Sequence, residues 1–213
     1  MPTDAGLPSS AFDDGRAVFR GHIAGFGTEI GLRIVVGLWI ESPFGRFADV
    51  MYESRVGIRT LLAPTEQVAE FVRSTYEFDE VHIVPVSARR LPDAMAVQAG
   101  PLRVDVALGG PAPLDRVLRL VPRRFATNRG WLRALDPLAS RLQPGAHTAG
   151  AAQAGRREYY GVLRSRAIVD VVGEIDGTDL GGLRPVDPPV RFGFASAPKR
   201  PQVLSVVTTV VEA

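Results

Sequence analysis

Short hydrophobic runs separated by glycine and proline dominate this chain. The runs are rich in β-branched and aromatic residues, and most are too short for helices. Such runs, ended by turn residues, are typical of strands in an antiparallel meander. The pattern predicts strands over residues 17–26, 32–41, 46–53, 58–63, 81–87, 94–108, 158–163, 167–175 and 203–211.

Two segments have helical periodicity instead. Thr65 suits the N-cap of a helix over residues 66–75, whose apolar positions fall on one face. Pro113 suits the first turn of another helix, and a further apolar stripe runs from Trp131 to Leu142. We therefore predict one helix packed on the sheet and a helical insertion at about residues 112–143.

These elements predict the fold class α+β. We expect a curved antiparallel β-sheet or incomplete β-barrel in a single domain over residues 16–213, preceded by a flexible N-terminus over residues 1–15. A chain of 213 residues with 46% hydrophobic and 23% charged residues suits one globular domain. The N-terminus lacks the features of a secretory signal, and no apolar run reaches roughly 18 residues. We therefore expect a soluble, cytoplasmic protein.

The composition removes much of the usual active-site chemistry. The chain has no cysteine, so a thiolate nucleophile and a disulfide framework are excluded. Its three histidines, His22, His82 and His147, lie far apart and form no paired ligand motif, so we expect no metal and no cofactor. Lys199 is the single lysine beside 24 arginines, and a Schiff-base mechanism would have to use it.

Charge is distributed unevenly along this arginine-rich chain. Residues 111–166 hold eleven arginines and three acidic residues, a local net charge of +8, whereas the remainder carries −6. This asymmetry fits an anion-binding face, and it equally fits two surfaces of one domain that neutralise each other. The basic region has no aromatic residues at the spacing of a stacking platform, so we do not expect nucleic-acid binding.

The strand over residues 46–53 carries the main candidates for acid–base chemistry. Alternation places Asp49 and Glu53 on one face. If that face lines a barrel, burial would raise the pKa of a carboxyl group and suit it to proton transfer; if the face is wet, both are ordinary surface acids. His22 and Arg20 share a face of the first strand and are possible partners of these acids. Asp49, Glu53 and His22 are therefore the candidate catalytic residues.

A second set of residues suits the binding of a small organic anion. Arg157 and Tyr159 lie in a dense arginine–tyrosine cluster, and arginine binds carboxylate or phosphate through paired hydrogen bonds. Arg20 and Arg191 complete the candidate ligand-binding set, the latter in a Pro-Pro loop that would cover either a cavity mouth or a sheet edge. The structural alternative for the cluster is a cross-strand Arg–Glu pair with one tyrosine in the core.

Two functions follow from these features. In the first, a small, partly apolar anion binds in the concavity of the sheet, with or without acid–base catalysis. In the second, the protein is not an enzyme, and the basic insertion over residues 112–143 docks on a membrane surface or an acidic partner. The sequence itself does not separate these two functions.

The segment Asp49-Val-Met-Tyr-Glu53, followed by a helix ending in Ser74-Thr-Tyr-Glu-Phe78, resembles the acetoacetate-decarboxylase-like barrels over residues 45–90. The resemblance implies a barrel fold. The family's catalytic lysine has no counterpart in this segment, since Lys199 lies in a proline-rich loop, which argues against decarboxylase chemistry. The chain as a whole also resembles proteins of the GC-rich, actinobacterial type, a resemblance that implies no mechanism.

Overall fold

The computed structural model describes residues 16–119, 149–151, 156–193 and 197–212. Two helices and thirteen strands occupy these ranges. Their order is β1 (Arg16–Thr28), β2 (Arg33–Glu41), β3 (Phe47–Glu53), β4 (Arg59–Ala63), α1 (Glu66–Arg73), β5 (Glu80–Ile83), β6 (Val86–Arg90), β7 (Ala94–Ala99), β8 (Leu102–Pro111), α2 (Pro113–Leu118), β9 (Ala149–Ala151), β10 (Arg156–Ile175), β11 (Thr178–Asp179), β12 (Leu183–Arg184) and β13 (Gln202–Glu212).

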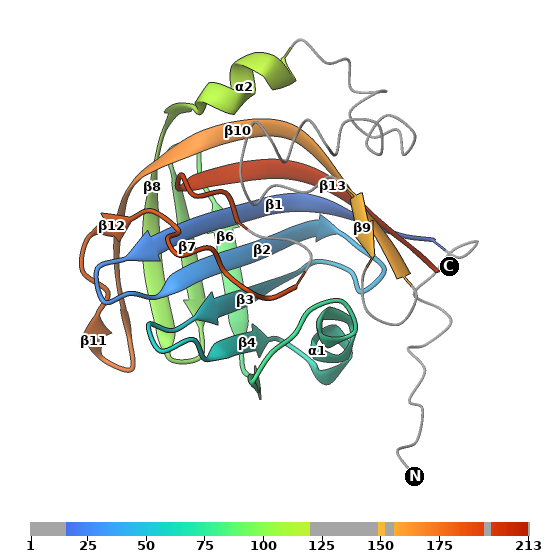
Figure 1. The fold of residues 1–213 in the computed structure, drawn as a ribbon, viewed down its shortest axis with the longest axis horizontal. Coiled ribbons are helices and arrows are strands. Elements are labelled where there is room, and N and C mark those ends of the chain that lie inside the picture. The colour runs from blue at the N-terminus through green and yellow to red at the C-terminus, as the bar shows by residue number, and fades with distance from the viewer. Residues whose placement is uncertain (1–15, 120–148, 152–155, 194–196, 213) are drawn as a thin grey trace.

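Ten strands form one continuous path in the order β5-β4-β3-β2-β1-β13-β10-β8-β7-β6. Figure 1 shows β3, β2, β1, β13 and β10 lying side by side along this path. The short strands β9 and β11 pair with β10, and β12 pairs with β1. Neighbours are antiparallel apart from β4 and β5, which are parallel because α1 carries the chain back between them. The structure confirms the prediction of an α+β fold built on a curved antiparallel sheet.

The sheet curls into a half-barrel, and its inner face is packed with side chains. The register shifts between Arg20 and Gly21 in the β1–β2 pairing and between Val162 and Arg164 in the β10–β13 pairing. Such bulges increase the local twist and bend. One buried cluster joins residues from both ends of the strand order, including Val36, Val50, Met95, Val106, Val171 and Val203. This apolar core fills the inner side of the curl, where the sequence analysis placed a ligand.

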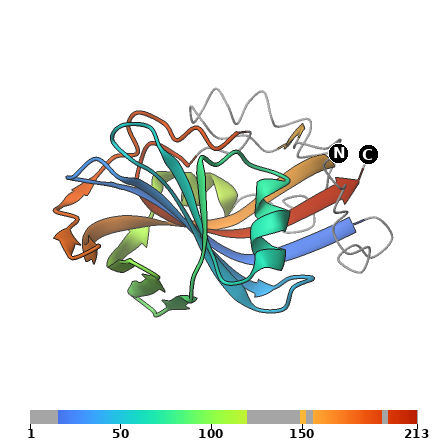
Figure 2. The same ribbon diagram turned by 90° about the horizontal axis from the view of Figure 1, so that it is seen from below.

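The outer face of the sheet is covered by α1 and by the strap, residues 185–193 and 197–201. In Figure 2, α1 lies across the long strands. The side chain of Thr65 accepts a hydrogen bond from the Val68 backbone N–H, as expected for the N-cap. The buried side of α1 includes Phe71 and Val72 and packs against the outer face. In the strap, Phe192 is fully buried in a separate apolar cluster with Val190 of the strap and Val35 of β2.

Three boundaries differ from the sequence pattern. The predicted strand over residues 81–87 is two strands, because Val84 and Pro85 interrupt the ladder and proline offers no backbone N–H. Gly100, at a φ of +53°, turns the chain between β7 and β8. Conversely, β10 runs unbroken through the polar residues between its two predicted halves.

The predicted insertion is described only at its start. The helix α2 begins at Pro113 as the pattern indicates, whereas residues 120–148, with the stripe from Trp131 to Leu142, lie outside the described residues, as do residues 1–15. No helix within the described ranges has the length and apolar character needed to cross a membrane.

Candidate ligand site

Strand β3 presents different chemistry to the two faces of the sheet. Ala48 and Val50 point into the inner core, so Phe47, Asp49 and Met51 lie on the outer face, since successive side chains alternate. The acidic face of this strand is therefore covered by α1 and the strap.

A cavity of about 50 Å³ lies between α1 and the outer face of the sheet. Its walls come from α1 and from strands β1, β2, β3 and β13. They are mainly apolar and aromatic, formed by Phe19, Ile23, Val35, Gly37, Trp39, Phe47, Asp49, Met51, Phe71, Val72, Thr75, Tyr76, Thr208 and Val210.

Asp49 supplies the charge of this cavity. Its residue surface is only 3% exposed. The Trp39 indole Nε1–H donates a hydrogen bond of 2.9 Å to Asp49 Oδ1, and Oδ2 has no hydrogen-bond partner within the described part of the chain. Burial raises the pKa of Asp49 to about 7, against the opposing effect of the Trp39 hydrogen bond, which lowers it. The carboxyl group therefore changes its charge near neutral pH.

Gly37 provides the space for this arrangement. It lies opposite Asp49 in the β2–β3 ladder. A Cβ atom at position 37 would collide with Asp49 Oδ1 and approach Trp39 Nε1 within 2.8 Å. The absence of a side chain at position 37 thus allows the indole and the carboxyl group to meet.

Thr208 adds a second polar group to the cavity wall. It is 2% exposed, and its hydroxyl oxygen has no hydrogen-bond partner among the described residues. Thr208 is on β13 and Asp49 is on β3, with β1 and β2 between them. The cavity lining therefore includes two buried polar side chains from different strands of the same sheet face, and buried polar groups are normally satisfied by a partner.

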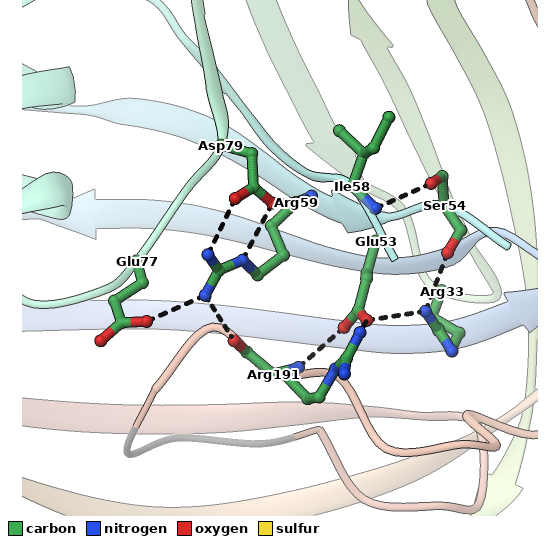
Figure 3. Close-up of polar contacts among 8 residues, drawn as sticks. All are labelled: Arg33, Glu53, Ser54, Ile58, Arg59, Glu77, Asp79 and Arg191. Carbon is green, nitrogen blue, oxygen red and sulfur yellow. Dashed lines mark hydrogen bonds and ion pairs between the residues drawn. The ribbon is translucent and has the colours of Figure 1, made fainter. Parts of the chain in front are cut away.

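Glu53 lies on the same face as Asp49 but holds the strap in place (Figure 3). It is fully buried, and its Oε1 lies 3.0 Å from Arg33 Nη2 and 2.9 Å from Arg191 Nη2. Its Oε2 accepts a 2.8 Å hydrogen bond from the Arg191 backbone N–H. These contacts occupy both carboxylate oxygens, so the geometry gives Glu53 an anchoring role.

Arg59 extends this anchor, as Figure 3 also shows. Its guanidinium group forms paired hydrogen bonds with Asp79 and a further bond with Glu77, and it reaches the carbonyl oxygen of Arg191 in the strap. The hydrogen bonds from Arg59 lower the pKa of Asp79 to about 2. This network ties the strap to the start of β4 and to the segment before β5.

His22 and Arg20 do not meet the two acids of β3. The His22 ring lies 3.2 Å from the Ser205 hydroxyl, on the inner side of β1, whereas Asp49 is on the outer face. Burial, assisted by the positive charge of Arg90, lowers the pKa of His22. Arg20 forms an exposed ion pair of 3.3 Å with Glu41. The partnership considered from the sequence is therefore absent from this arrangement.

The predicted ligand-binding residues do not form one site. Arg191 is on the strap over the outer face, and Arg20 is on the opposite face of the sheet. Tyr159 is buried and pairs with Thr209 of β13. For Arg157 the structure describes the backbone, which pairs with Val211 and Ala151, and not the side chain. Arg20 and Arg191 therefore lie on different faces of the sheet and do not belong to one anion site.

Part of the positive charge of residues 111–166 is neutralised internally. Asp115, on α2, is buried and accepts hydrogen bonds from Arg164, from Arg119 and from the Ser165 backbone N–H. These donors, Arg164 first, hold the pKa of Asp115 well below its usual range. Arg164 and the Ser165 N–H thus fix α2 against β10, whereas Arg119 bonds Asp115 within the same helical segment. Asp115 is one of the three acids already counted in the local net charge of +8, so the interpretation of two mutually neutralising surfaces stays a prediction.

The residues that surround Asp49 could not be recognised as one group from the sequence pattern. Trp39, Phe19 and Phe71 come from three separate elements, and the sequence pattern predicted those elements without relating the three residues to Asp49. The available signal was local: Gly37 and Trp39 share one face of their strand and suggest a space beside an indole. Thr208 carried no signal in the sequence.

Comparisons with known proteins give a faint resemblance to solved structures. No family model matches the sequence, and a search of the curated proteins finds no match. Among solved structures, the chain is similar to an acetoacetate decarboxylase from Legionella pneumophila, with 10% identity and a TM-score of 0.41, over 93% of this chain and 83% of that one. Similarity at this level carries no information about the chemistry of the Asp49 cavity.

Proposed function

We propose that the protein binds a small, largely apolar molecule in the cavity beneath α1, with Asp49 as its polar contact. The observation that carries this proposal is a buried carboxyl group on the cavity wall with one oxygen bonded to Trp39 and the other without a partner in the described chain. Buried polar groups are normally satisfied, so an unfilled bonding position facing a cavity indicates a ligand or bound water.

The cavity limits the size of the molecule. A volume of about 50 Å³ corresponds to roughly four water molecules by the space that one water requires. A ligand of a few non-hydrogen atoms fits, whereas a nucleotide or an organic cofactor does not fit without movement of the walls. Apolar side chains supply most of the contact, which favours an apolar body with one polar end.

The anion expected from the sequence is not the ligand that this cavity favours. None of the described residues that line the cavity is arginine or lysine, and an anion would lie beside the ionisable Asp49. The alternative of docking through residues 112–143 stays a prediction, since most of that segment lies outside the described residues.

The titration of Asp49 gives the site a second use. A carboxyl group whose pKa is about 7 exists in both protonation states near neutrality, which suits a general acid or base. We therefore propose proton transfer to or from the bound molecule as the candidate reaction class, with Asp49 as the residue that carries it.

The binding proposal is tested with a neutral probe and the indole N–H signal of Trp39 in a proton–nitrogen NMR spectrum. Addition of 1-butanol should shift this signal in a saturable manner, because the indole borders the cavity. Val72→Phe adds a ring to the α1 wall and should abolish the shift. Asp105→Asn, at an exposed position on β8, is the matched control and should behave as the wild type. Identical responses of the wild type and Val72→Phe would refute binding in the cavity.

A further inference from the structure

The cavity has a single source of charge within the described chain. Asp49 is the only acidic residue of its walls, and no basic residue lines it. An ionised carboxylate enclosed by apolar groups is strongly disfavoured unless a positive charge pairs with it. None of the described residues that line the cavity is an arginine or lysine that could pair with Asp49. A positively charged group on a ligand would therefore supply the missing counter-charge of this carboxylate.

Aromatic rings occupy much of the remaining wall. Five aromatic residues line the cavity, from four elements and the segment after α1, namely Phe19, Trp39, Phe47, Phe71 and Tyr76. The rings of Phe19 and Trp39 meet edge to face with centroids 5.5 Å apart, and those of Trp39 and Phe47 are 6.4 Å apart. The faces of aromatic rings are negative and attract cations, most strongly when water is excluded.

We propose that the cavity selects a small organic ammonium ion, whose nitrogen binds the Asp49 carboxylate beside the Trp39 ring. The proposal rests on the proposed function, since it names the ligand class of the same cavity. The alkyl part of the ion lies along the apolar wall that includes Ile23 and Val72, and the free oxygen of Asp49 accepts a hydrogen bond from the ammonium group. Carboxylate and aromatic faces act together, because both favour positive charge and both disfavour an anion.

Protonation gives the proposal a directional test. The carboxylate form of Asp49 binds the cation, so affinity for an ammonium ion should fall as the pH drops below about 7, where Asp49 takes up a proton. Among the described residues on the cavity walls, the other titratable side chain is that of Tyr76, which follows α1. The wall residues from β1, β2 and β13 have no titratable side chain. Tyr76→Phe should therefore keep the pH response.

Three probes of equal chain length separate the contributions of charge and size. These are butylammonium, 1-butanol and butanoate, titrated at pH 8 into the full-length protein while the Trp39 indole signal is followed. We expect butylammonium to bind about tenfold more tightly than 1-butanol and butanoate to bind more weakly than both. At pH 6 the preference for butylammonium over 1-butanol should shrink severalfold.

Asp49→Asn is the decisive variant. It keeps the shape of the side chain and an acceptor for the Trp39 N–H while removing the charge. It should lose the preference for butylammonium at every pH and still bind 1-butanol. Asp105→Asn, as the matched control, should retain the wild-type preference.

The outcomes distinguish this inference from the proposed function. If 1-butanol binds and butylammonium binds no more tightly, the ammonium assignment is overturned while the cavity remains a ligand site. Preferential binding of butanoate also overturns it and supports the anion expected from the sequence. If no probe binds the wild type, the proposed function fails and this inference fails with it.

Discussion

Replacing Asp49 with asparagine should stabilise the protein in a manner that depends on pH. The carboxyl group is buried, and its pKa is raised from 3.8 to about 7 in the folded protein. An acid with a higher pKa in the folded state binds its proton more tightly there than in the unfolded chain. The free energy of unfolding therefore decreases as the pH rises from about 4 to about 7, and the full cost of burying the charge is present above pH 7.

The size of this effect follows from the shift. A change of about 3 pKa units, at 1.36 kcal/mol for each unit, amounts to roughly 4 kcal/mol. The neutral amide of the Asp49→Asn variant carries no such cost at any pH, so the difference in unfolding free energy between this variant and the wild type should grow by that amount between pH 4 and pH 8. The amide NH₂ adds an offset that does not change with pH, so the slope is the quantity to measure.

Urea denaturation monitored by circular dichroism at pH 4, 6 and 8 provides the assay, with carboxyl carbon NMR to follow the Asp49 titration directly. Other ionisable groups contribute equally to both proteins and cancel in the difference. A difference that stays constant from pH 4 to pH 8, or an Asp49 resonance that titrates near 4, would refute the reasoning.

Three further substitutions test the surroundings of the site. Glu53→Gln should lower the free energy of unfolding by roughly 3 kcal/mol in urea denaturation, because the buried Arg33 loses its counter-ion. Gly37→Ala should cost about 1–3 kcal/mol in the same assay, since the added methyl collides with the Asp49 carboxyl group. Trp39→Phe removes the N–H that lowers the pKa of Asp49, so that pKa should rise above 7 in an NMR titration.

Matched variants show whether these effects are specific. Glu41→Gln breaks only an exposed ion pair and should change stability by less than about 1 kcal/mol. Gly110→Ala adds a methyl group with no heavy atom within 4 Å and should be nearly neutral. Equal losses of unfolding free energy in Gly37→Ala and Gly110→Ala would argue against a collision at position 37. An unchanged pKa of Asp49 in Trp39→Phe would show that the indole N–H does not influence this carboxyl group.

The sequence by itself determined most of the elements and the fold class. Thr65 was predicted as a helix N-cap and is one, and Pro113 begins α2 as expected. These features depend on residues within a few positions of one another, such as a capping hydroxyl or an imposed proline φ. The alternation of residues 47–53 likewise identified the correct strand and the correct pair of acids on one face.

Only the tertiary structure decided what covers that face and what each acid contacts. A period of two is the same whichever face of a strand meets the core, so the sequence could not tell the filled inner side of the half-barrel from the outer side beneath α1. Trp39 meets Asp49 through the register of β2 and β3. Glu53 meets Arg191 across 138 positions of the chain. Strand register and long-range packing therefore place the Asp49 carboxyl group on the cavity wall and make the Glu53 carboxylate an anchor for the strap. Burial and hydrogen-bond partners depend on residues that meet only in the folded protein.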